Sequence, residues 1–419
     1  NTAAGTNNII STTGIIAGGP HAIYGYGVSI DGGNLTLNVQ SGGVVNGGTG
    51  SLRLNSAGTA AVTIASGGLV TGYVQASGTG ARTFIINGAL GGNYDAGAGA
   101  NTAVDTITLG ATGTVLNMTL GLGNDQFTYQ GGGINGIVNA GAGTDAFIST
   151  LGAGNSSTPL LSRISAFETL THTSGNLTLS GAAAAPAMAI IAGNGANSGM
   201  VTLTGTTGLT GGITVNGAIL RAATVGALGT GAITMIDPTI QFGATGTYTN
   251  AINLAVLAPA SADPTRLEAD AGVTATLSGL ISRTGGDAAQ HITIGGAGTV
   301  VLTNVSNSWT GLTTIDAGAT LRGTLRAISG SAIVDNGALI LDEASAFTMA
   351  RAISGTGTLT KIGLGNLTLS GTNSFTGATT VSAGTLTLAG GAALADSSAV
   401  TVASEATLNI GFSEANGNM

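Results

Sequence analysis

A fixed spacing between similar residues in the first half of the chain limits the folds that this sequence can adopt. Four apolar residues recur at equal intervals, and an aspartate stands two positions before each of the first three. The apolar residues are Ile107, Phe127, Phe147 and Phe167, and the aspartates are Asp105, Asp125 and Asp145. A period of about 20 residues fits one turn of a β-helix, in which each turn stacks on its neighbour. We therefore expect the four apolar residues to form a ladder that points into the core.

Short strand phrases with a period of two recur along the chain. Leucine alternates with threonine in residues 34–38 (NLTLN), 366–370 (NLTLS) and 385–389 (TLTLA). This alternation places leucine on one face of a strand and threonine on the other, and the Gly or Asn residues that follow allow the tight backbone of a corner. The sequence therefore predicts an all-β chain, a right-handed parallel β-helix (solenoid) with about 20 residues per turn and about 20 turns.

The composition agrees with a thin core between closely spaced strands. The chain has 74 glycines, 4% aromatic and 7% charged residues, whereas a globular protein has about 25% charged residues. Its 43% apolar residues argue against disorder. The lack of cysteine excludes disulfides and thiolate metal sites. A net charge of −8 without a basic stripe argues against a nucleic-acid partner, and no apolar run is long enough to span a bilayer.

A longer repeat is superimposed on the single turns. Its best copy covers residues 353–386 and a second copy covers 298–321, with Trp309 at the position of Phe375; a degraded third copy spans 201–220. Together with phrases in residues 164–181, these copies closely resemble the autotransporter-associated β-strand repeats of passenger domains. The resemblance extends over roughly residues 105–412 and is strongest after residue 290.

The resemblance implies one β-helix passenger fragment over residues 1–419. Within it we expect divergent turns or a cap in 1–104, regular turns in 105–290 with loops near 183–198 and 257–270, and the longer repeats in 291–419. Passengers of this type reach the surface of Gram-negative bacteria through a C-terminal outer-membrane β-barrel. That barrel is absent from the sequence, so we expect the native protein to continue, with the passenger on the cell surface.

The resemblance and the polar strand faces together predict an adhesin. Rows of Thr, Asn and Ser suit lateral pairing between identical passengers on neighbouring cells, which would produce autoaggregation and biofilm, and attachment to a host surface is a variant. The alternatives are a non-catalytic rod or stalk that binds a glycan or a host matrix protein, and a β-helix enzyme that cleaves polysaccharides. We expect no enzyme and no cofactor.

The aspartate ladder is the sharpest candidate site. Like charges one strand spacing apart repel each other unless they are solvated or bridged by a cation. Residues 121–127 and 141–147 partly resemble the calcium-binding nonapeptide repeat, but the longer spacing in this chain removes the tandem half-sites of that repeat. We therefore interpret Asp105, Asp125 and Asp145 as structural or solvated carboxylates, with a calcium ladder as the alternative.

Polysaccharide cleavage would need convergent carboxylates. Asp342 and Glu343 are neighbours on a strand and should point to opposite faces. Glu268 and Asp270 can share a face with Arg266, and we interpret this group as a solvated turn with a local ion pair.

The remaining candidates for chemistry are isolated. His21, His172 and His291 lie far apart in the sequence, and we expect His172 and His291 on the surface of strands. No nucleophile phrase of a serine protease occurs, so no catalytic residue is expected. Trp309 is expected to pack in the core or at a corner, and an exposed platform for a sugar ring is the alternative.

Overall fold

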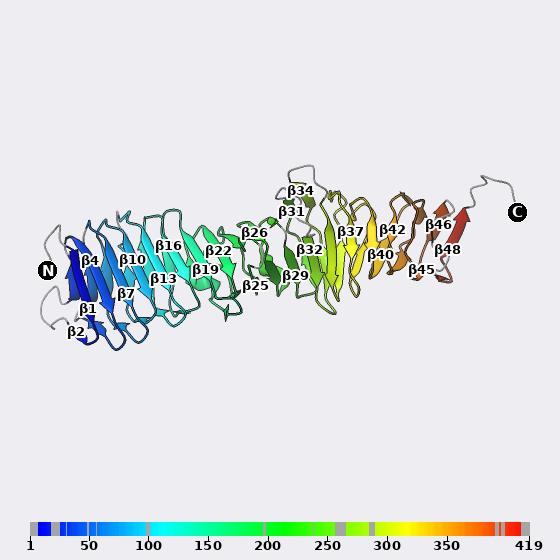
Figure 1. The fold of residues 1–419 in the computed structure, drawn as a ribbon. Coiled ribbons are helices and arrows are strands. Elements are labelled where there is room, and N and C mark those ends of the chain that lie inside the picture. Colours follow the sequence, from blue (N-terminus) through cyan, green and yellow to red (C-terminus); the bar gives the residue numbers. More distant parts are fainter. Residues whose placement is uncertain are drawn as a thin grey trace. The chain divides into compact units, whose positions relative to one another are not determined.

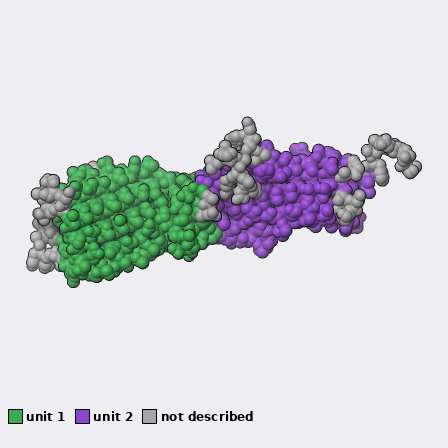
Figure 2. Space-filling model, in the orientation of Figure 1, with its two compact units in different colours: residues 1–212 green, residues 213–419 purple. Residues whose placement is uncertain are grey.

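The computed structural model of the chain is an all-β parallel solenoid of about 17 turns with about 21 residues per turn. The structure describes residues 7–17, 26–30, 32–47, 50–55, 57–97, 101–195, 198–236, 238–255, 265–284, 290–389, 394 and 399–411. The predicted fold class is confirmed; the coils average about 21 residues where about 20 were expected, and there are about 17 turns where about 20 were expected. Among the described residues, no helix has the length and apolar character needed to cross a membrane. The chain divides into unit 1, residues 1–212, and unit 2, residues 213–419 (Figure 2).

Unit 1 contains three long stacks of parallel strands, here called sheets A, B and C, and the start of a fourth, sheet D (Figure 1). Sheet A consists of β1 (Asn7–Thr12), β4 (Asn34–Val39), β7 (Ala60–Ile64), β10 (Arg82–Ile86), β13 (Asp105–Leu109), β16 (Gln126–Tyr129), β19 (Ala146–Thr150), β22 (Thr169–Ser174) and β24 (Ala189–Ala192). Sheet B consists of β2 (Ile15–Ala17), β5 (Val44–Asn46), β8 (Leu69–Val70), β11 (Ala89–Leu90), β14 (Thr114–Val115) and β17 (Gly133–Ile134). Sheet C consists of β3 (Tyr26–Ile30), β6 (Gly50–Leu54), β9 (Val74–Ala76), β12 (Tyr94–Asp95), β15 (Met118–Gly121), β18 (Val138–Gly141) and β21 (Ile164–Ser165). Sheet D includes β20 (Ser156–Ser157), β23 (Asn176–Ser180) and β25 (Met200–Thr204), and a 3-10 turn, η1, spans Leu161–Arg163.

Period-two alternation builds the thin core of unit 1. In β4, for example, Leu35, Leu37 and Val39 are buried while the residues between them are more exposed. The corners before four strands of sheet A, namely β7, β10, β16 and β19, contain a glycine where successive backbones approach closely. A Cβ on Gly80 would lie 1.8 Å from the carbonyl oxygen of Gly58 in the preceding coil, so a larger residue would force the coils apart.

The apolar ladder is confirmed for three of its four members. Ile107 pairs with Phe127 and Phe127 with Phe147 in the parallel register, and the last two rings stack at 5.4 Å. The place expected for Phe167 as the fourth member was wrong, because the residue that pairs with Phe147 is Leu170. The coil that contains η1 is longer than the coils before it, so Phe167 falls before β22. It is still buried and packs edge-on against Phe147 at 5.7 Å.

Unit 2 also consists of stacked parallel strands. One stack contains β26 (Ile213–Asn216), β28 (Ile233–Ile236), β31 (Ile252–Ala255) and β34 (Ile281–Thr284). A second contains β27 (Ile219–Ala222), β29 (Thr239–Phe242), β32 (Thr265–Ala269), β35 (Ile292–Gly296), β37 (Thr313–Ile315), β39 (Ile333–Asp335) and β42 (Ile353–Ser354). A third contains β30 (Gly246–Tyr248), β33 (Thr274–Leu277), β36 (Thr299–Leu302), β38 (Thr320–Gly323), β40 (Ala338–Asp342), β43 (Thr358–Ile362), β45 (Thr379–Val381) and β47 (Val400–Val402). A fourth contains β41 (Phe347–Met349), β44 (Asn366–Leu369), β46 (Thr385–Ala389) and β48 (Thr407–Gly411), and a 3-10 turn, η2, spans Val225–Leu228.

Two segments were expected to form loops. The segment 183–198 contains strand β24, while residues 183–188 have no strand or helix. In the segment 257–270, residues 257–264 lie outside the described residues, and β32 begins at Thr265.

Candidate functional site

The three aspartates of the ladder lie at the start of successive strands of sheet A and point into the solenoid. Asp105 begins β13, and Asp125 and Asp145 stand immediately before β16 and β19. Their side chains are 0%, 2% and 0% exposed. Each aspartate is two positions before an inward aromatic or aliphatic residue, so period-two alternation places it on the buried face. Of the two roles that were expected, structural or solvated, the burial of these carboxylates agrees with the structural one.

The carboxylates of Asp125, Asp145 and Glu168 each accept a hydrogen bond from a backbone N–H of the preceding coil. The N–H of Asp105 donates to Oδ1 of Asp125 at 2.7 Å, and the N–H of Asp125 donates to Oδ1 of Asp145 at 2.6 Å. The N–H of Asp145 donates in turn to Oε2 of Glu168 at 2.6 Å. We call Asp105, Asp125, Asp145 and Glu168 the acidic ladder. Its carboxylates supply the acceptors for backbone donors at the corner, which would otherwise be buried without a partner.

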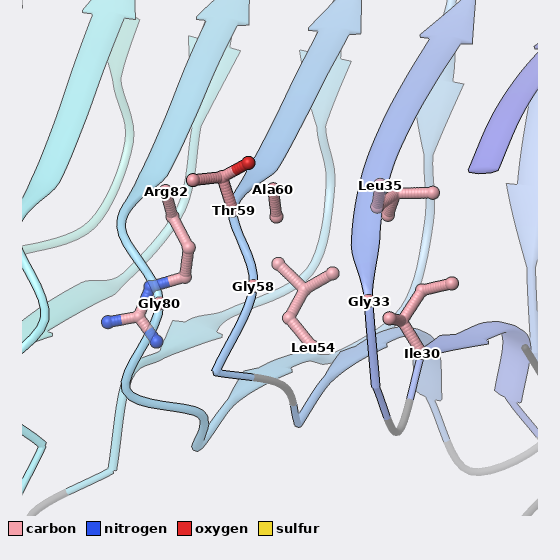
Figure 3. A pocket seen from close by; sticks show the side chains of 9 residues that line it. All are labelled: Ile30, Gly33, Leu35, Leu54, Gly58, Thr59, Ala60, Gly80 and Arg82. Carbon is pink, nitrogen blue, oxygen red and sulfur yellow. The ribbon is translucent and has the colours of Figure 1, made fainter. Parts of the chain in front are cut away.

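Arg82 and Tyr94 terminate the acidic ladder at its first member. Nε of Arg82 donates to Oδ1 of Asp105 at 2.5 Å, and the hydroxyl of Tyr94 donates to Oδ2 at 2.5 Å. Figure 3 shows Arg82 reaching from the start of β10 toward Gly80, beside a cavity of about 10 Å³. A cavity of this size can hold one water molecule, and Nη2 of Arg82 has no hydrogen-bond partner among the described residues.

The sequence did not reveal Arg82, Tyr94 or Glu168 as part of this site. The interval from Arg82 to Asp105 and the interval from Asp145 to Glu168 are both longer than the interval between the aspartates. A search at the fixed spacing of the aspartates therefore misses both residues. The available signal was the face that each side chain shares with its apolar neighbour, since Arg82 stands two positions before the buried Phe84.

The ladder changes the ionisation of its members. The pKa of Asp125 is raised to about 7, mainly by burial and also by the neighbouring charges of Asp105 and Asp145, against the lowering effect of the hydrogen bond from the Asp105 N–H. Burial also raises the pKa of Asp105, although Arg82 and Tyr94 counteract it. For Asp145, burial and the nearby Glu168 carboxylate both raise the pKa. Among the described residues, Arg82 is the one arginine that forms an ion pair with this row of stacked carboxylates.

Two carboxylate oxygens of the acidic ladder are buried and accept no hydrogen bond from a described residue. Oδ2 of Asp125 and Oδ2 of Asp145 are buried without a hydrogen-bond partner among the described residues. They can carry a proton. No group of three or more His, Asp or Glu side chains in the described parts of the chain is arranged to hold a metal ion. The calcium ladder stays a prediction.

The carboxylates of the enzymatic alternative are engaged in ion pairs on the surface of unit 2. Arg266 contacts Oε1 of Glu268 at 2.9 Å and Oδ2 of Asp316 at 2.7 Å, and Arg221 contacts Oδ2 of Asp270 at 2.5 Å. Arg266, Glu268 and Asp270 therefore lie on one face as expected, and each acid has a cationic partner.

Asp342 and Glu343 diverge as the strand period predicted. Asp342 lies partly exposed and contacts Arg322 at 2.7 Å. Glu343 is buried, and its Oε1 accepts a hydrogen bond from the N–H of Leu325. The two carboxylates do not converge on a common site.

The histidines differ in burial: His172 is buried and His291 is exposed. The surface position expected for His172 is wrong, because it is fully buried with Nδ1 3.1 Å from Oγ of Ser149 and Nε2 3.0 Å from the carbonyl oxygen of Gly175. His291 is exposed, and His21 lies outside the described residues.

Trp309 is 1% exposed and its Nε1 donates to Oγ1 of Thr313. It packs in the core, which rules out an exposed sugar platform.

The outward face of sheet A carries two continuous rows of uncharged side chains in unit 1. In register from β4 to β24, the first row is Thr36, Ala61, Thr83, Thr106, Gln126, Ala146, Thr169 and Ala189, and the second is Asn38, Thr63, Ile85, Thr108, Thr128, Ile148, Thr171 and Ile191. All of them are partly or fully exposed. We call these positions together the neutral face. The charged side chains described in unit 1 lie elsewhere, as Arg53 and Asp95 do on sheet C.

A comparison with protein families finds similarity in unit 2. A family model described as the passenger-associated-transport-repeat matches residues 295–322 and 359–388. The first match runs from the end of β35 to β38 and the second from β43 to β46, so each covers little more than one coil. No curated protein matches the chain.

Proposed function

We propose that this chain, whose transport repeats and β-solenoid fit an autotransporter passenger domain, mediates cell–cell self-association through the neutral face of unit 1. The family implies a secreted protein anchored at the outer membrane, with a C-terminal translocator in the full-length protein. The proposed function is adhesive and not catalytic, which agrees with the ion pairs that Glu268, Asp270 and Asp342 form with arginines.

The absence of charge on the neutral face carries this proposal. The chain has a net charge of −8, and two negatively charged surfaces that approach each other lose binding energy through like-charge repulsion. Because the two rows contain no acidic or basic side chain, the faces of two copies can meet without that penalty. A second copy of the chain is therefore the partner that suits this surface.

The size of the neutral face predicts a weak contact that becomes effective by repetition. Eight strands at about 4.8 Å and two rows of side chains give a face of about 500 Å² per copy. A total of about 1,000 Å² lies at the lower limit of specific interfaces. The threonine hydroxyls can form hydrogen bonds of about 0.5–1.5 kcal/mol each, and display of many copies on a cell multiplies such contacts.

Settling of a non-adherent bacterium that displays the full-length protein tests the proposal. The wild type should clump, and the double substitution Thr108→Glu with Thr128→Glu should abolish clumping because it places stacked carboxylates in the middle of the neutral face. A matched control, Thr119→Glu with Asn139→Glu, puts the same charges on sheet C of the same unit and should leave clumping intact.

The proposal fails if the neutral-face variant clumps as the wild type does at equal surface display. A parallel sample with a chelator examines the calcium alternative, since loss of clumping there would indicate a cation in the contact. Binding to host matrix or glycans without clumping would favour the rod or stalk alternative.

A further inference from the structure

A groove of about 240 Å³ opens to solvent beside the end of sheet B in unit 1. It lies between β17 and the segment that leads from β20 into η1. The residues that matter for its chemistry are Tyr129, Asn135, Ser157, Thr158, Leu160 and Arg163. None of them belongs to the neutral face or to the acidic ladder.

The groove exists because one coil departs from the stacking of its predecessor. β17 is the last strand of sheet B, while β20 pairs with β23 in sheet D instead of with β17. The same coil is longer, as the register from Phe147 to Leu170 shows. The segment from Ser157 to Arg163 therefore follows a path that does not pair with β17, and the groove lies between this segment and β17.

Arg163 gives the groove a positive charge that no described acid neutralises. Its Nη1 donates to the carbonyl oxygen of Ile134 at the end of β17. The ion pairs found among the described residues join Arg82, Arg221, Arg266 and Arg322 to carboxylates, but not Arg163. The remaining guanidinium N–H groups form a planar fork that matches a carboxylate.

The other walls of the groove offer a small apolar platform and polar groups. Leu160 is 39% exposed, and Asn135 and Thr158 are exposed. The hydroxyls of Tyr129 and Ser157 hydrogen-bond to each other, which fixes both side chains at the groove wall. A sugar ring presents the matching combination of an apolar face and hydroxyls at its rim.

We infer that this groove binds one carboxylate-bearing sugar unit, a hexuronate, with its carboxylate on Arg163 and its ring against Leu160. The volume is below the roughly 300–1,000 Å³ of sites for drug-sized ligands, so it suits a single ring. The side chains of Asn135 and Thr158 supply hydrogen-bond partners for the ring hydroxyls. This site is independent of the proposed self-association, because it shares no residue with the neutral face.

Saturation-transfer NMR and calorimetry on the whole chain test the inference with glucuronate, galacturonate, glucose, galactose and acetate. At least one hexuronate should bind at least tenfold more tightly than the matching neutral hexose and than acetate. Arg163→Gln should remove that preference. Thr158→Trp, which fills the groove and keeps the arginine, should weaken hexuronate binding at least tenfold.

The control Arg322→Gln, at an exposed ion pair of unit 2, should change nothing. Equal binding of hexose and hexuronate would overturn the role of Arg163, and equal binding of acetate and hexuronate would overturn the role of the ring. No saturable binding of either hexuronate by the wild type would overturn the site as a whole. Because Arg163 also caps the edge of sheet B, circular dichroism must show that Arg163→Gln is folded, and Thr158→Trp keeps the test decisive if it is not.

Discussion

The substitution Asp125→Asn should remove much of a pH dependence that the acidic ladder builds into unit 1. Burial raises the pKa of Asp125 from 3.8 to about 7, whereas the unfolded chain keeps the lower value. Between these values the folded protein binds more protons than the unfolded chain does. The contribution of Asp125 to the stability is therefore highest at low pH and is lost as the pH rises from about 4 through about 7. At about 1.4 kcal/mol per pKa unit, the loss due to this one side chain approaches about 4 kcal/mol.

Asparagine keeps the acceptor for the N–H of Asp105 but cannot ionise. From pH 5 to pH 8 the free energy of unfolding should decrease by roughly 2.5 kcal/mol less in the variant than in the wild type. A smaller decrease should remain, because burial also raises the pKa values of Asp105 and Asp145. Above pH 7 the variant should be the more stable protein.

Hydrogen exchange of the backbone amides in β13 and β16 provides the local measurement that this prediction needs, because the coils of a solenoid can open separately. Protection, corrected for the intrinsic exchange rate, should fall from pH 5 to pH 8 in the wild type and much less in Asp125→Asn. Asp95→Asn, at a partly exposed carboxylate of β12, is the matched control and should follow the wild type. Equal slopes in the wild type and Asp125→Asn, or wild-type protection that increases with pH, would refute the reasoning.

Two further substitutions examine the corner that holds the ladder. Arg82→Met should cost about 3–5 kcal/mol in urea unfolding at pH 7, because it leaves the buried Asp105 without its cationic partner; an unchanged midpoint would contradict the ion pair. Gly80→Ala should lower the melting temperature more than Gly14→Ala, since the added Cβ meets a carbonyl oxygen at 1.8 Å in the first case and open space in the second. Equal melting temperatures would show that the coils can separate at no cost.

The sequence predicted the fold well because the period of the strands is a local property. Ile107, Phe127 and Phe147 have the expected register, since the coils that join them are equal in length. The prediction failed at Phe167 because an insertion around η1 changes the length of one coil without disturbing its strands. Coil length depends on corner conformation, which the alternation of apolar and polar residues does not encode.

The candidate site was predicted in its position but not in its environment. Asp125 shares a strand face with Phe127, so the alternation already implied a buried carboxylate, and His172 is buried beside Leu170 for the same reason. Charged and polar groups are more often exposed to solvent, which is why the surface position expected for His172 was wrong and why solvation of the aspartates was left open beside a structural role. The groove at Arg163 could not be predicted. It forms where sheet B ends at β17 and the strand of the next coil, β20, belongs to sheet D.

Unit 2 shows that the structural task of the acidic ladder does not require an acid. There the N–H of Ile281 donates to Oδ1 of Asn307 and the N–H of Ile353 donates to Oδ1 of Asn373, each at 2.8 Å. These asparagines meet a strand-start donor from a neighbouring coil, as Asp125 does in unit 1. The amide accepts the same hydrogen bond and carries no charge, so it avoids the cost of burying an ion. Aspartate in the corresponding hydrogen bond of unit 1 therefore adds one property that asparagine lacks, which is an ionisable group whose raised pKa predicts a stability that depends on pH.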